Sequence, residues 1–122
     1  MIELEPAHLV GTGGAIGALA RHYVATLVDV ERFPLGTLTV NVIGSFLLGL
    51  LTFAGVGSDV MLLVGTGACG SFTTFSSFSF DTVRLWETGS RLRAGIDAAV
   101  NMLGALLAIG LAWALGQLLV GL

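Results

Sequence analysis

Four long stretches with little or no charge constrain most strongly how this chain can fold. They cover about residues 8–28, 35–56, 60–86 and 98–122, and the second and fourth contain no charged side chain. A helix that crosses a bilayer needs roughly 20 mostly apolar residues, so each stretch is long enough. We therefore predict an all-α membrane protein, a single domain over residues 1–122 with transmembrane helices at about 8–28, 35–56, 60–86 and 92–121.

Composition supports lipid as the main solvent. Only 11% of the residues are charged, against about 25% in a soluble domain. The first stretch does not resemble a signal peptide, because Glu3 and Glu5 precede it where a basic region is expected. Cys69 is the single cysteine, so no intrachain disulfide can form, and we expect a small buried side chain there.

The connections are short, and their charges predict an orientation. With four spans, both termini share one side with the second connection, at residues 57–59. The basic residues of the loops all fall on the opposite side: Arg32, Arg84, Arg91 and Arg93. Because basic loops favour the cytoplasm, we expect both termini to face outward, in the plasma membrane or inner membrane.

Small residues recur in the predicted helices. The chain has 18 glycines, several of them in the first, second and fourth helices. Small residues let membrane helices approach closely and associate. Since four helices enclose little by themselves, we expect oligomers, although packing within one subunit is the simpler alternative.

The stretch "GTGACGSFTTFSSFSF", residues 65–80, has the letters of a dinucleotide-binding loop. That motif requires a βαβ unit, and this chain offers no strand pattern. Residues 60–86 would make a helix of about 40 Å, longer than a span requires. We therefore predict a break near residues 70–74, where freed carbonyl groups could bind a small cation.

Beyond the predicted break, Phe75 and Phe78 are three residues apart and share one helix face. An aromatic ring has a positive edge, so a ring presented edge-on can meet an anion. Nearby serine hydroxyl groups can donate hydrogen bonds to the same anion. Simple packing of the rings is the alternative interpretation.

A second polar run, residues 36–46, places Thr37, Asn41 and Ser45 four apart on one helix face. Asn101 lies near the start of the fourth helix. Such groups often join helices to one another, but they could also converge on a pathway. No basic residue lies at the middle of a span, so a compact anion that accepts strong hydrogen bonds fits best.

Three sequences carry a resemblance to a known family: "GTLTVNVIGSFLLG" at 36–49, "GACGSFTTFSSFS" at 67–79 and "GGAIGALAR" at 13–21. Together they resemble the Fluc (CrcB) family of small fluoride channels over essentially the whole chain. The resemblance implies an antiparallel, dual-topology dimer with two pores, each lined by both subunits. It also implies passive export of cytoplasmic fluoride and a structural Na⁺ on the dimer axis.

The resemblance also implies roles for individual residues. The pore residues would be Phe75, Phe78, Asn41, Thr37, Ser76 and Ser77, with Arg21 near a vestibule. The backbone carbonyl groups of Gly70 and Thr73 would hold the Na⁺.

Two features depart from the family pattern. The chain has no Ser or Thr from residue 98 onward, where the family usually has a serine, and Asn101 would take that place. The loop arginines also lie on one side, whereas a dual-topology homodimer should have balanced loops. An oppositely biased homologous partner would explain this; a homodimer that inserts both ways is the alternative.

Three other functions compete. A small multidrug transporter needs a carboxylate within the membrane, and we expect none in helices one, two and four, with Asp81 at a helix end. A non-conducting assembly subunit would not need clustered polar stripes. An enzyme is not expected, because no nucleophile–base pair or metal-ligand set is visible; His8 and His22 lie toward the ends of helix one.

Overall fold

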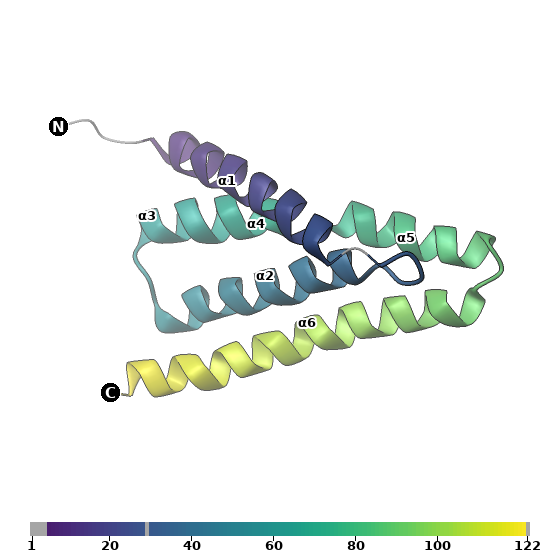
Figure 1. Ribbon diagram of the computed structural model, residues 1–122. Coiled ribbons are helices and arrows are strands. Elements are labelled where there is room, and N and C mark those ends of the chain that lie inside the picture. The colour runs from purple at the N-terminus through teal and green to yellow at the C-terminus, as the bar shows by residue number, and fades with distance from the viewer. Residues whose placement is uncertain (1–4, 29, 122) are drawn as a thin grey trace.

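The computed structural model describes residues 5–28 and 30–121, and every regular element in these ranges is helical. Helix α1 covers Pro6–Leu27 and α2 covers Leu35–Ala54 (Figure 1). A third run from 58 to 87 is divided into α3 (Ser58–Val60), a π-helical segment η1 (Met61–Cys69), α4 (Gly70–Phe72) and α5 (Phe75–Glu87). Helix α6 covers Arg91–Val120.

Three of these runs are long and apolar enough to cross a membrane: Leu35–Ala54, Ser58–Glu87 and Arg91–Val120, in a search of the described residues. Helix α1 has 22 residues but is not among them. Its sequence mixes glycines with Arg21, His8 and His22, which lowers its hydropathy. A crossing by α1 therefore stays a prediction.

Helix α2, helix α6 and the run from α3 to α5 lie lengthwise along one axis, and α1 crosses them obliquely (Figure 1). Helix α2 packs along α6, α1 packs across η1, and α5 packs on the first part of α6. The start of α1, the turn from α2 to α3 and the end of α6 lie at the same end of the bundle. This is the arrangement expected when sequential helices reverse direction at short connections.

Glycines determine how closely α1 approaches η1. Gly13 and Gly17 are buried, and a Cβ atom at either position would collide with the backbone carbonyl of Leu63 or Ala68. The Ser71 hydroxyl donates to the Gly14 carbonyl at 2.7 Å across the same contact. The predicted use of small residues for close packing therefore applies within one subunit here.

The helix break is narrower than the predicted range of 70–74. Thr73 (φ −78°, ψ 157°) and Thr74 (φ −148°, ψ 119°) are extended, whereas Gly70 (φ −61°, ψ −34°) is helical. Thr74 is the N-cap of α5, and its hydroxyl oxygen accepts the Ser77 N–H at 3.1 Å. A threonine N-cap stabilises a new helix start, so the break lies just before it.

The expectation that the fourth helix has no carboxylate is wrong. The uncharged stretch at 98–122 begins only after Asp97, but α5 ends at Glu87 and α6 already begins at Arg91, after a turn with Gly89 at φ 86°. Asp97 therefore lies inside α6, with 0% of its surface exposed. The hydropathy pattern suggests that the span begins after the carboxylate. The pattern does not reveal the hydrogen-bond donors that allow Asp97 to be buried.

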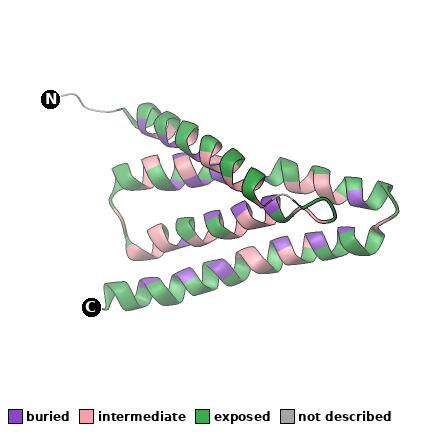
Figure 2. Ribbon diagram, viewed as in Figure 1, coloured by how far each residue is buried: buried purple, intermediate pink, exposed green. Residues whose placement is uncertain are grey.

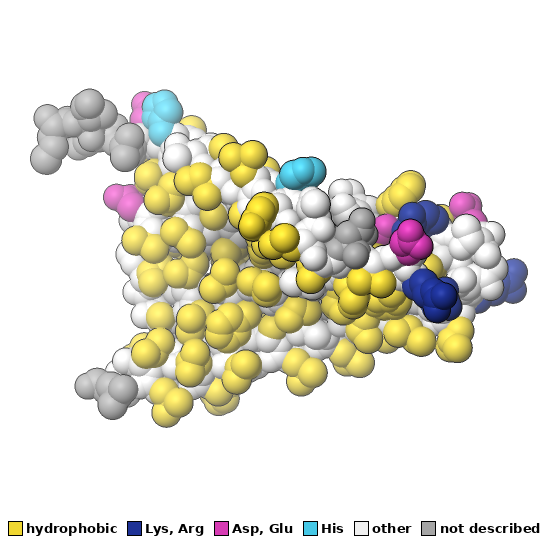
Figure 3. Space-filling model, in the orientation of Figure 1, with side chains coloured by type: hydrophobic (Ala, Val, Ile, Leu, Met, Phe, Trp, Pro, Cys, Tyr) yellow, Lys and Arg dark blue, Asp and Glu magenta, His cyan; other side chains and the backbone are white. Residues whose placement is uncertain are grey.

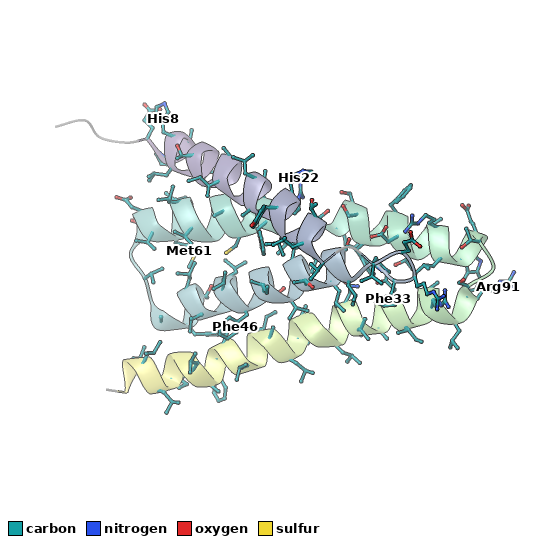
Figure 4. All side chains as sticks on the ribbon, in the orientation of Figure 1. His8, His22, Phe33, Phe46, Met61 and Arg91 are labelled. Carbon is teal, nitrogen blue, oxygen red and sulfur yellow. The ribbon has the colours of Figure 1, made fainter. Side chains whose placement is uncertain are left out.

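Much of the outer surface is apolar. Buried residues form small patches along the helices, and the remaining residues are intermediate or exposed (Figure 2). Hydrophobic side chains cover most of the face in Figure 3, and the visible arginines gather at the end where α5 joins α6. Arg91, labelled there in Figure 4, lies 4.9 Å from the centre of the Trp86 ring. Such a surface suits lipid or a partner subunit.

Candidate functional site

Asn41 of α2 holds the helix break. Its side-chain oxygen accepts the Thr74 N–H at 2.7 Å, and its amide nitrogen donates to the Thr74 carbonyl at 3.0 Å. The extended backbone at Thr74 cannot make helical hydrogen bonds, and irregular backbone at membrane depth must be satisfied by other groups. Asn41 therefore supplies both partners that the break lacks.

The Asn41 amide also donates to the side-chain oxygen of Asn101 at 3.3 Å, which joins α2 to α6. Both residues line a cavity of about 590 Å³ beside the break. The residues around it include four that the sequence singles out for a pore: Asn41, Phe75, Phe78 and Asn101. Helices α2, α5 and α6 thus bring these predicted residues together.

The two phenylalanine rings lie on the wall of this amide–ring cavity. Their centres are 5.8 Å apart, and the ring planes are inclined by 50°. Phe75 is 78% exposed in the single chain, whereas Phe78 is only partly exposed. A large exposed ring beside a cavity is suited to contact with lipid, a partner chain or a ligand.

The predicted hydroxyl groups lie around a different hollow of about 740 Å³. Thr37, Ser76 and Ser77 line it, together with His22 of α1, whose position Figure 4 shows. The same hollow is also lined by Asp81 and Arg84. Thr37 donates to Asp81 at 2.9 Å, and Arg84 lies 3.8 Å from the same carboxylate. Within a single chain, the predicted rings and the predicted hydroxyl groups therefore line two different hollows.

A smaller hollow of about 210 Å³ lies between α1 and the break. Arg21, Thr37 and Ser77 line it, and so does Thr74, which also lines the amide–ring cavity. Thr74 is 8% exposed. The break therefore forms part of the wall between the hydroxyl side and the ring side.

The predicted cation ligands differ in how free they are. In a continuous helix the Thr74 N–H would donate to the Gly70 carbonyl, but here it donates to Asn41. The Gly70 carbonyl is thus released for another partner. The Thr73 carbonyl accepts the Arg21 guanidinium at 3.5 Å. Two carbonyl groups are too few for a hard cation, which takes several oxygen ligands, so one chain offers part of a site.

Four polar residues of this region were not among the predicted site residues: Thr74, Asp81, Thr82 and Asp97. The spacing of Thr74 and Ser77 is an N-cap signal and was available from the sequence. Asp81 follows Phe78 by three residues, which places it on the same helix face. Asp97 precedes Asn101 by four residues, and Asn101 donates to its carboxylate at 3.0 Å.

Comparison with known proteins assigns the family. Residues 8–116 match the family model described as CrcB-like protein, Camphor Resistance (CrcB). The chain belongs to the CrcB family. A relative from Haloarcula marismortui, named fluoride-specific ion channel FluC 2, is 66% identical over 113 residues, which make up 93% of this chain and 95% of the relative.

Two further members extend the match. FluC 1 of Halobacterium salinarum is 53% identical over 110 residues, covering 90% of this chain and 92% of its own length. FluC 2 of Natronomonas pharaonis is 47% identical over 118 residues, covering 97% and 100%. Both are named fluoride-specific ion channels.

Family membership confirms the resemblance drawn from the three sequence motifs. With three apolar helices in the described residues, it identifies a multi-pass membrane protein. It is also consistent with the expectation that the chain is not an enzyme. The multidrug-transporter alternative loses its support, even though Asp97 is a buried carboxylate in a helix that is long and apolar enough to cross a membrane.

Proposed function

We propose that this CrcB-family protein is a fluoride-selective channel that lets cytoplasmic fluoride leave the cell passively. The observation that carries the proposal is the convergence of Asn41, Asn101, Phe75 and Phe78 on one cavity beside the helix break. Amide groups and ring edges offer weak positive partners without a fixed charge. That chemistry suits a small anion that must enter and leave quickly.

The proposed conducting unit is an antiparallel, dual-topology dimer with two pores and four spans in each chain, including α1. The division of rings and hydroxyl groups between two hollows supports it, because one chain does not complete a path. Thr37, Ser76 and Ser77 of one subunit would then continue the track beyond the rings. Arg21 would attract anions at a vestibule.

A structural Na⁺ at the dimer axis belongs to the same proposal. The released Gly70 carbonyl supports it, and a second copy would supply the oxygen ligands that one chain lacks. The positive charge would also favour anions nearby. Preparing the protein with N-methylglucamine in place of sodium should lower dimer stability, and identical melting of the dimer in both salts would argue against the site.

The test is anion efflux from liposomes that contain the purified protein, measured with fluoride and chloride electrodes in parallel. We expect fast fluoride efflux without chloride efflux. Phe75→Ile and Asn41→Asp should reduce it by at least tenfold. Phe46→Ile is the matched control, because Phe46 lies on α2 against an apolar groove (Figure 4) and away from the amide–ring cavity.

Each outcome has a distinct meaning. Fluoride efflux that survives in Phe75→Ile and Asn41→Asp would refute the assigned pore. A silent, monodisperse and inserted wild-type sample would show that the chain alone does not conduct. The charge bias of the loops would then point to an oppositely oriented homologous partner in the plasma membrane, or to a non-conducting assembly subunit.

Accessibility of tags at both ends in intact cells distinguishes the two kinds of dimer. Labelling of one side only would support a heterodimer with a partner of opposite bias. Equal labelling from both sides would exclude it and support a homodimer that inserts both ways.

A further inference from the structure

Asp97 is the most deeply buried charged residue of the described chain, with 0% of its surface exposed. A carboxylate inside a membrane helix is costly and usually has a function. The single ion pair found among the described residues joins Arg84 to Asp81, so Asp97 relies on neutral donors. Its position calls for an explanation that packing alone does not provide.

Two donors satisfy the carboxylate, and they come from two helices. The Thr82 hydroxyl of α5 donates to one oxygen at 2.7 Å. The Asn101 amide of α6 donates to the other at 3.0 Å and to the Asp97 carbonyl at 2.9 Å. Hydrogen bonds to a charged acceptor are about twice as strong as neutral ones. Asp97 is thus a polar joint between α5 and α6.

The joint connects the helix that carries the rings to the amides, and both groups line the amide–ring cavity. Thr82 lies one helical turn beyond Phe78, and its hydroxyl is also 2.9 Å from the Phe78 carbonyl. On the other side, Asn101 contacts Asn41. A chain of hydrogen bonds therefore runs from the ring-bearing helix through Asp97 to the two amides.

The chain has one direction, since both of its ends are unambiguous. The Thr74 N–H can only donate, and it donates to Asn41. Asn41 donates to Asn101, and Asn101 donates to the Asp97 carboxylate, which accepts. The side-chain amides of Asn41 and Asn101 are therefore both oriented with the oxygen atom toward the Thr74 end of the chain and the NH₂ group toward Asp97. Asp97 therefore helps to set how the amides face the cavity.

We propose that Asp97 is a positioning residue of the pore, which holds the ring-bearing helix α5 at a set distance and register from the amides of Asn41 and Asn101. This inference rests on the proposed channel function. It assigns Asp97 no contact with the ion. The hydrogen bonds of its side chain, and not its negative charge, carry the role.

Two pairs of variants test the joint from both sides. Asp97→Ala removes the acceptor, and Thr82→Val removes the donor with little change of shape. We expect each to lower fluoride efflux per folded protein by at least tenfold. Asp97→Asn should instead keep fluoride efflux within about threefold of wild type. The side-chain oxygen of the new asparagine can accept from Asn101, and its amide group can donate to the Thr82 hydroxyl. Thr82→Ser should also keep efflux within about threefold of wild type, because serine retains the hydroxyl donor.

A double variant separates positioning from general damage. If Asp97 and Thr82 act through one hydrogen bond, the double variant Asp97→Ala/Thr82→Val should conduct fluoride no more slowly than the less active of the two single variants. Asp59→Ala is the control, because Asp59 is an exposed carboxylate at the other end of the bundle. Chloride efflux, recorded in the same liposomes, reports leakage.

Several results would overturn the inference. The first is fluoride efflux at the wild-type rate in a folded Thr82→Val sample. The second is a double variant whose fold-loss equals the product of the two single losses. The third is a loss in Asp97→Asn as large as in Asp97→Ala, or in Thr82→Ser as large as in Thr82→Val. If Asp97→Ala does not give a monodisperse sample, the Thr82 pair alone decides. A silent wild-type protein would instead refute the proposed function, and the positioning role with it.

Discussion

Substitution of Gly17 by alanine tests how the scaffold beside the break is built. An added Cβ would collide with the Ala68 carbonyl and the Ser71 hydroxyl. The Ala68 carbonyl is backbone and cannot rotate away, so α1 must move away from η1. Overpacking of this kind costs about 1–3 kcal/mol, and separation would also weaken the hydrogen bond from Ser71 to Gly14.

Helix propensity acts in the opposite direction. Replacing glycine by alanine inside a helix gains up to about 1 kcal/mol. Gly11 and Gly14 are on the same helix, and an added Cβ at either would meet nothing within 4 Å. Gly11→Ala and Gly14→Ala should therefore be neutral or stabilising. Because this gain is common to all three variants, we expect Gly17→Ala to be less stable than both by the overpacking cost, about 1–3 kcal/mol.

Thermal melting of the purified protein in detergent, followed by circular dichroism, measures the difference. For a chain of this size, 1 kcal/mol corresponds to roughly 3–6 °C in Tm. The Gly17→Ala variant should thus melt about 3–18 °C below the two controls. A Gly17→Ala protein that melts with the controls or above them would refute the close backbone contact between α1 and η1.

Two other substitutions extend the same reasoning. Thr74→Ala removes the acceptor for the Ser77 N–H and should cost about 0.5–2 kcal/mol, whereas Thr74→Ser should keep most of it; equal melting of the two variants would contradict the N-cap. Gly116→Ala places a Cβ 2.8 Å from the Phe53 Cβ between α6 and α2. It should melt several degrees below Gly110→Ala, where an added Cβ meets nothing within 4 Å, and the reverse order would count against this packing.

Local chemistry was enough to predict several features of this protein. Long apolar runs predict membrane helices because every backbone group must be satisfied within the segment. The excess length of residues 60–86, with its glycines and threonines, predicts a break. The spacing of Asn41 and Ser45, or of Phe75 and Phe78, places each pair on one helix face. Each inference depends on neighbours within a few turns of the same helix.

The tertiary structure decided which of these faces meet. It directs Asn41 to the backbone of Thr74, separates the rings from the hydroxyl groups, and buries Asp97 against Thr82 and Asn101. Sequence periodicity gives the direction of a side chain around its own helix, but not the rotation and depth of the next helix. In the sequence, Asp97 resembles the polar end of a span. In the folded chain it is buried inside α6, because donors from two helices satisfy its carboxylate.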